Sequence, residues 1–135
     1  MKTRTTLLVL LLLCCFFQPL VAADSIYISL VQLIANPRDY DGKVVHVIGF
    51  MRLEFDGTAI YLHQDDYKHY ITKNGLWIDV PKDLLKKKDE FNQKYVIVGG
   101  TFSAKETGRK GLWSGSIQKV SKVQVWVESD GKDSP

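Results

Sequence analysis

The alternation of apolar and polar residues constrains the fold of this chain most, because a period of two is typical of a β-strand with one buried face. The pattern begins at Lys43, and its apolar side carries Val45, Val47, Met51, Leu53 and Phe55. The other side is mixed and carries His46, Arg52 and Glu54. Gly49 interrupts this long predicted strand, and a glycine inside a strand indicates a bulge or a sharp bend. Asp56-Gly57 then predicts a hairpin turn.

Two further strands are predicted after this turn, at 58–63 and 75–80. Their inward positions are Ile60, Leu62, Leu76, Ile78 and Val80. Their outward positions are Tyr61, His63, Trp77 and Asp79. Because residues two apart in a strand share a face, we expect Tyr61 and Trp77 to lie near each other on the outside of the domain.

The second half of the chain begins with a predicted helix at 81–93, opened by Pro81, in which Leu84 and Phe91 share one face. A fourth strand follows at 95–102, with Val96, Val98 and Phe102 on one side. After a loop at 103–111, a last strand region spans 116–127. Its apolar positions change parity near Val120, which predicts a bulge there.

A short helix is predicted ahead of the first strand. Ser29 and Gln32 form a capping-box pattern, and the helical face consists of Tyr27, Leu30, Val31 and Ile34. Asn36-Pro37 ends this helix, because the residue before a proline avoids the α region. Gly42 follows in a turn where a positive φ is expected.

This order, a helix, three strands, a helix and two strands, is the plan of an OB-fold, a five-stranded Greek-key barrel. We therefore predict a mainly β, OB-fold-like barrel at 24–128, with a helix between its third and fourth strands. A long first strand with a central glycine fits, because that strand serves both halves of such a barrel. A small sandwich and an SH3-like barrel are the alternatives.

The first 23 residues have the composition of a cleaved signal peptide. A basic start with Lys2 and Arg4 precedes a short apolar run, and Val21 and Ala23 provide the small side chains of a cleavage site after Ala23. The alternative is a lipid anchor at Cys14 or Cys15, but Leu13 stands where a small residue is expected. Cleavage predicts a periplasmic or secreted protein without cysteine. The polar end of the chain, at 129–135, is predicted separately to be a disordered tail.

Charge argues against nucleic acid as the partner. The full chain has a formal net charge of +3, and loss of Lys2 and Arg4 leaves +1. Affinity for nucleic acid depends on many phosphate contacts, which a nearly neutral domain does not supply. We likewise expect no transmembrane segment in the mature chain, because the apolar run is too short to cross a bilayer.

Three segments resemble a set of small exported bacterial proteins with an OB-like barrel, most of them uncharacterised. The segments are LVQLIANPRDYDGKVVHVIGF, NGLWIDV and KYVIVGGTFSAKETGRKGLWSGSI, which together cover most of the mature chain. The resemblance implies an architecture and a bacterial envelope location, and it carries over no catalytic residue.

The stretch LHQDDYKHY, at 62–70, raises the question of a metal site. Its candidate ligands are His63, Asp65, Asp66 and His69. The two histidines are six residues apart, whereas ligands on one helix face are three or four apart, and no H-E-x-x-H pattern occurs. We therefore expect no metal and interpret the stretch as a connection with one helical turn capped by Asp65 or Asp66.

Patterns of known catalytic chemistry are also missing from the sequence. The serines near the end of the chain, Ser114 and Ser116, lie outside any G-x-S-x-G elbow, and Asp65 and Asp66 are adjacent and therefore diverge. A phosphate-binding glycine loop is missing as well, because the Gly99-Gly100 pair lies inside a strand pattern and not at a helix start. We expect a protein that is not an enzyme and that needs no cofactor.

A binding module with this fold would use the outer face of strands two and three together with the loop between strands four and five. The predicted ligand-binding residues are Tyr61, His63, Trp77, Asp79, Lys105, Arg109, Lys110 and Trp113. Aromatic rings stack on flat or apolar ligands and cations pair with anionic groups, which suits a saccharide or a peptide. Alternatively, Trp77 packs under the 64–74 connection and Trp113 fills the end of the barrel as core.

A protein-interaction module, such as an envelope assembly factor or an inhibitor or immunity protein, is the second functional hypothesis. A groove with exposed aromatic side chains would favour the ligand-binding hypothesis. A broad, flat apolar patch would favour the protein-interaction hypothesis.

Overall fold

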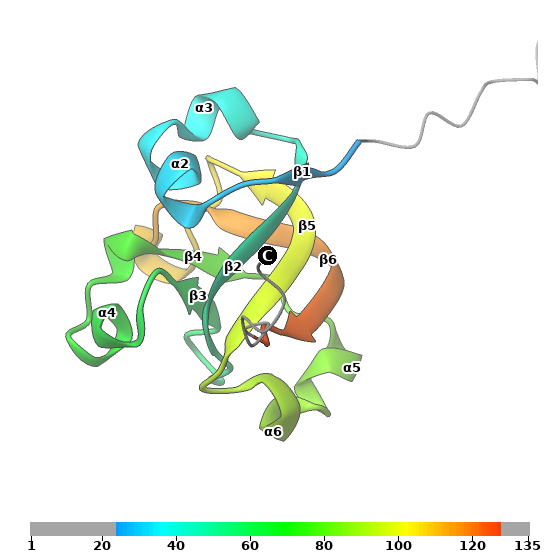
Figure 1. Ribbon diagram of the computed structural model, residues 1–135. Helices are drawn as coiled ribbons and strands as arrows, with labels where there is room; N and C mark the ends of the chain where they lie inside the picture. The colour runs from blue at the N-terminus through cyan, green and yellow to red at the C-terminus, as the bar shows by residue number, and fades with distance from the viewer. Residues whose placement is uncertain (1–23, 128–135) are drawn as a thin grey trace, which may run out of the picture.

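The computed structural model describes residues 24–127 of the 135-residue chain (Figure 1). The predicted signal peptide at 1–23, with Cys14 and Cys15, and the predicted tail at 129–135 lie outside the described residues. The cleavage site and the tail therefore stay predictions.

Six strands form one sheet. They are β1 (Ile26–Tyr27), β2 (Val44–Arg52), β3 (Ala59–Tyr61), β4 (Gly75–Ile78), β5 (Tyr95–Ser103) and β6 (Ser116–Val125). The helices are short: α2 (Leu30–Ala35), α3 (Pro37–Tyr40), α4 (Gln64–Lys68), α5 (Lys82–Leu85) and α6 (Lys88–Phe91). Two 3-10 turns, η2 (Thr72–Asn74) and η3 (Arg109–Gly111), complete the elements.

The sheet closes into a barrel. Its strand order is β1-β2-β3-β4-β6-β5, and an additional pairing of β2 with β5 joins the two ends. The β4–β6 pair is parallel, whereas the other pairs of the barrel are antiparallel. Five strands thus form a closed, mixed barrel, and β1 adds a sixth strand parallel to β2. The predicted mainly β, OB-fold-like barrel is confirmed.

The barrel core follows the predicted alternation. The inward residues of β2 to β6 that are almost fully buried include Val45, Val47, Met51, Ile60, Leu76, Ile78, Val96, Val98, Phe102 and Ile117. Leu30 and Leu33 of α2 close one end of this core. Ser29 caps α2 as predicted, since its Oγ accepts a hydrogen bond from the Gln32 amide at 3.2 Å. Tyr27 was predicted in the helical face, but it lies in β1.

Gly49 is needed for close packing and does not mark the predicted bulge. Its pairing with Val96 continues the regular β2–β5 register. A Cβ at this position would lie 2.6 Å from the Tyr61 carbonyl oxygen and 2.7 Å from side-chain carbons of Ile60 and Leu30. The glycine therefore lets β3 and α2 approach the middle of β2. The predicted bulge near Val120 is confirmed, because residues 119–121 lie opposite Gly100 alone.

The connection from β2 to β3 differs from the prediction. The strand ends at Arg52, and the Leu53 amide donates to the Asn92 side chain at 2.9 Å instead of continuing the ladder. The Thr58 hydroxyl then donates to the Glu54 carbonyl at 2.8 Å, which closes a loop longer than a two-residue turn. Phe55 was expected to point inward, but it lies on this loop and is fully exposed.

The predicted helix at 81–93 is also broken. It consists of α5 and α6, separated at Lys86 and Lys87, where Lys87 has non-helical angles of φ −100° and ψ 24°. Phe91 is the buried residue of the pair, and Leu84 packs partly buried against the core. Phe91 is thus the one buried side chain of α5 and α6, which is too little to hold a continuous helix against the barrel.

Candidate functional site

The predicted binding face begins with Tyr61, which points out of the barrel as expected but is not exposed. Only 4% of its surface is accessible, and the same holds for Trp113. Together with Phe50 and Ala59 these side chains form a second buried cluster, against which Tyr67 and Trp77 pack. The expectation that Tyr61 and Trp113 lie open to solvent is therefore wrong, because two loops cover this face. Trp113 is core, as in the alternative, but it lies in this second cluster and not at the end of the barrel core.

One cover is the 64–74 connection, which carries α4 as the predicted helical turn. The Tyr67 ring lies edge-on to Tyr61, with centroids 5.7 Å apart. Asp66 holds the connection in place: its carboxylate accepts from the His63 amide at 2.9 Å and from the Asn74 side-chain amide at 2.8 Å. His63 is the N-cap residue, and Asp66 bonds back to it from inside the first turn. The predicted cap at Asp65 or Asp66 is corrected accordingly.

Asp65 and Asp66, considered above as metal ligands, have structural roles in this connection. Asp66 is largely buried and uses both carboxylate oxygens for the two hydrogen bonds described above. Asp65 pairs on the surface with Lys68 at 3.3 Å. Within residues 24–127, no three side chains of His, Cys, Asp or Glu come together as a metal site.

The other cover is the loop from β5 to β6. The Trp113 ring packs edge-on against Trp77, with centroids 5.0 Å apart and an interplanar angle of 62°. Gly108 lies directly against both rings, since a Cβ there would be 2.8 Å from a ring atom of each. Lys73 of η2 donates to the Gly111 and Trp113 carbonyls at 3.0 and 3.2 Å, which ties the two covers together.

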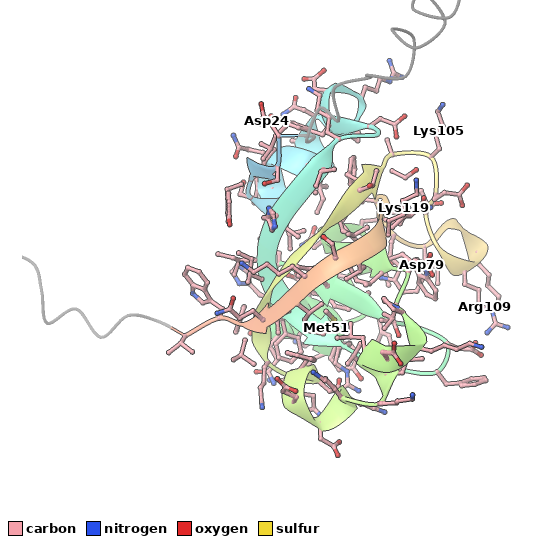
Figure 2. The ribbon with its side chains drawn as sticks, turned by 90° about the vertical axis from the view of Figure 1, so that its right-hand side faces the viewer. Asp24, Met51, Asp79, Lys105, Arg109 and Lys119 are labelled. Atoms are coloured by element: carbon pink, nitrogen blue, oxygen red, sulfur yellow. The ribbon has the colours of Figure 1, made fainter. Side chains whose placement is uncertain are left out.

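The basic side chains of the β5–β6 loop do not converge. Arg109 forms an ion pair with Asp56 on the β2–β3 loop, whereas Lys105 lies 4.0 Å from Asp41, which follows α3. Figure 2 shows Lys105 and Arg109 projecting from separate parts of the loop. Lys110 is exposed in η3 with a φ of 58°. The predicted site thus divides: Lys105 lies beside Asp41, whereas Arg109 lies beside the β2–β3 loop.

The surface beside Trp77 is open and forms a groove with a volume of about 460 Å³. Its lining combines the β2–β3 loop, the end of β4 and the helices that follow: Leu53, Glu54, Phe55, Thr58, Trp77, Ile78, Asp79, Val80, Leu85 and Lys88. Trp77 and Asp79 are the predicted site residues in it, and Figure 2 places Asp79 on the same side of the barrel as Arg109. Asp79 is exposed and forms no ion pair with any described residue.

Sequence reasoning missed Phe55, Leu85 and Lys88 as groove residues. Phe55 was assigned inward by extending the strand alternation past Arg52, and the α5–α6 break that presents Leu85 was not predicted. The Asp56-Gly57 pair was the one available signal, since it marks a loop, and residues beside a loop leave the strand pattern.

Glu54 connects the groove to the buried cluster. Its carboxylate accepts from the Arg52 guanidinium and from the Tyr67 hydroxyl, the latter at 2.8 Å. The bond from Arg52 is the main cause that holds the pKa of Glu54 below its usual value. The Arg52 guanidinium also lies 4.3 Å from the centroid of the Tyr67 ring. The pKa of Tyr67 is raised by its bond to the Glu54 carboxylate, and burial raises the pKa of Tyr61.

Comparison with family models and with curated proteins gives no relative. No model of a protein family matches the chain, and a search of curated proteins finds no similar sequence. Among the described residues, no helix has the length and apolar character to span a membrane.

Proposed function

We propose that this protein is an exported, non-enzymatic binding domain that takes a saccharide or peptide ligand in the groove beside Trp77. Export rests on the predicted signal peptide, which would deliver the domain to the periplasm or the exterior of the cell. The groove, with two aromatic residues in its lining, is the observation that carries the binding proposal.

The chemistry of the groove suits a ligand with both apolar faces and hydrogen-bond donors. Phe55 is fully exposed and Trp77 partly exposed, so both rings are available for stacking on a sugar ring or an apolar side chain. Asp79 has no ion-pair partner among the described residues and can accept hydrogen bonds from hydroxyl or amide groups. Lys88 adds a cation to the lining of the groove.

The shifted pKa values nearby have a structural origin. Those of Glu54 and Tyr67 come from one hydrogen-bonded network that joins the β2–β3 loop to α4, and that of Tyr61 comes from burial. A shifted pKa in a cleft is a sign of catalysis only when the group is free to act on a substrate. Glu54 and Tyr67 are bonded to each other and Tyr61 is buried, which favours binding without a reaction.

The test is binding of the chain starting at Asp24 to arrays of envelope-type oligosaccharides and of peptides, followed by titration of the best ligand. Trp77→Ala and Phe55→Ala should each weaken binding at least about tenfold, because each removes a stacking surface. Trp126→Ala is the matched control, since Trp126 is also exposed but does not line the groove. The proposal would be contradicted if all three variants bound the ligand equally weakly, or if none of them bound it more weakly than the unchanged chain.

The second candidate is a protein-interaction module, an envelope assembly factor or an inhibitor or immunity protein. The full exposure of Phe55 on a loop favours it, because a projecting aromatic residue can fill a pocket of a partner. In that case Phe55→Ala would abolish capture of a protein from envelope extract, while the arrays would show no ligand.

A further inference from the structure

A second outer face of the barrel lies over β1, β2, β5 and β6, which run side by side in Figure 1. Its exposed large apolar side chains are Tyr27, Ile48, Tyr95 and Trp126, with accessible fractions of 68%, 38%, 40% and 49%. We refer to these four residues as the aromatic face. No loop of residues 24–127 covers them, in contrast to Tyr61 on the other side.

The strand register makes the aromatic face continuous. The Tyr27 ring stacks on His46 with centroids 4.6 Å apart, and His46 precedes Ile48 by two residues on β2. Ile48 is paired with Ile97 of β5, next to Tyr95 on the same side of that strand. The Trp126 amide donates to the Tyr95 carbonyl at 2.8 Å, so the tryptophan adjoins the tyrosine.

The strands under the aromatic face carry positive charge only. None of the residues of β1, β2, β5 and β6 is Asp or Glu, whereas β6 contains Lys119 and Lys122. Lys122 lies on the aromatic face itself, since its register partner is Gly99, which lies against His46. The groove side, by contrast, carries the carboxylates of Glu54 and Asp79.

We propose that the aromatic face docks on the surface of an anionic lipid bilayer. Tyrosine and tryptophan are the residues that favour the boundary between lipid and water, and lysine attracts anionic headgroups. Lys122 on this face and the lack of Asp and Glu in its strands therefore favour an anionic bilayer over a neutral one.

Flotation with lipid vesicles tests this proposal. The chain starting at Asp24 is suitable, because it contains every residue of the closed barrel and its core. It should float with vesicles of phosphatidylglycerol, and about fivefold less with vesicles of phosphatidylcholine, where Lys122 gains nothing. Raised salt should release it from the anionic vesicles.

Two variants and one control identify the surface. The double variant Tyr27→Ser, Trp126→Ser should lose flotation at least about tenfold, and Lys122→Glu should lose it on the anionic vesicles. Phe55→Ser is the control, since it removes a more exposed aromatic side chain from the groove side and should float like the unchanged chain. Because Phe55 and the aromatic face are tested separately, failure of the groove proposal leaves this test intact.

Three results would overturn the proposal. The first is no flotation with phosphatidylglycerol, and the second is undiminished flotation of the double variant. The third is a dimer of the unchanged chain, dissociated by the same double variant, without flotation. That result would assign the aromatic face to a second copy of the chain.

Discussion

The two outer sides of the barrel differ in the solvent exposure of their aromatic side chains. On one side, Tyr61 and Trp113 are buried under the 64–74 connection and the β5–β6 loop. On the other, Tyr27 and Trp126 remain exposed. Both sides follow the same strand alternation, which decides only whether a side chain points into the barrel or out of it. The long loops determine whether an outward side chain is exposed, because the side chains that they cover become a second core.

The largest expected effect is the difference in stability between substitutions at Trp113 and at Trp126. Trp113→Ala should lower the free energy of unfolding by about 4 kcal/mol, because it leaves a cavity beside Tyr61 and Trp77. Trp126→Ala should change it by less than about 1 kcal/mol, since half of its surface is already accessible. Urea unfolding of both variants provides the measurement. Similar losses would mean that the two sides are equally buried in solution.

A glycine pair tests how closely the β5–β6 loop covers its side. Gly108 and Gly111 both have a φ of 68°, but a Cβ on Gly108 would lie 2.8 Å from the Trp77 and Trp113 rings. The nearest atom to a Cβ on Gly111 is a Thr107 oxygen at 3.6 Å. We expect Gly108→Ala to cost about 3 kcal/mol, from the ring contacts together with a ψ of −167° that only glycine adopts readily, and Gly111→Ala about 1 kcal/mol of unfolding free energy. Equal costs in thermal unfolding would show that backbone strain alone matters.

The next largest loss of stability is expected at Asp66, which holds the 64–74 connection in place. Asp66→Ala should cost about 2 kcal/mol, because it removes the acceptor for the His63 amide and for the Asn74 side chain. Amide hydrogen exchange should also become faster at 64–74. Asp65→Ala is the matched control, since Asp65 is exposed and only pairs with Lys68, and it should cost less than about 0.5 kcal/mol. Unchanged exchange in Asp66→Ala would show that Tyr67 packing alone holds the cover.

The barrel could be predicted from the sequence because its signals are local and repeated. The alternation of valine, isoleucine and leucine fixed which residues enter the core, and Ser29, Gly42 and the parity change near Val120 were each confirmed. Each depends on the geometry of a few neighbouring residues.

The candidate site could be predicted only in part, because it is made by loops far apart in the sequence. Trp77 and Asp79 line the groove, but Phe55 joins them only because the strand ends at Arg52. The burial of Tyr61 depends on Tyr67 and Trp113, six and 52 residues away along the chain. Alternation contains no information about such contacts, so exposure was the property that it predicted least well.

The smallest expected effect concerns the network between the groove and the buried side. The pKa of Glu54 lies below its usual value of 4.5, chiefly because Arg52 donates to its carboxylate. The ionised carboxylate therefore adds stability above pH 4.5, and this contribution is lost as the pH falls through the lowered pKa. Glu54→Gln should remove that part of the pH dependence. The difference stays below about 1 kcal/mol, because 40% of the Glu54 side chain is accessible.

Urea unfolding of the unchanged chain and of Glu54→Gln, at several pH values between about 3 and 6, measures this difference. The two curves should converge toward the acid end, where Glu54 is protonated and its bonds to Arg52 and Tyr67 lose their charge. Tyr67→Phe is the informative control, because it removes the hydroxyl bond and keeps the ring over the buried cluster. It should retain most of the pH dependence, since Arg52 makes the larger contribution. If Tyr67→Phe removed it entirely, the cover on α4, rather than the strand β2, would control the charge on Glu54.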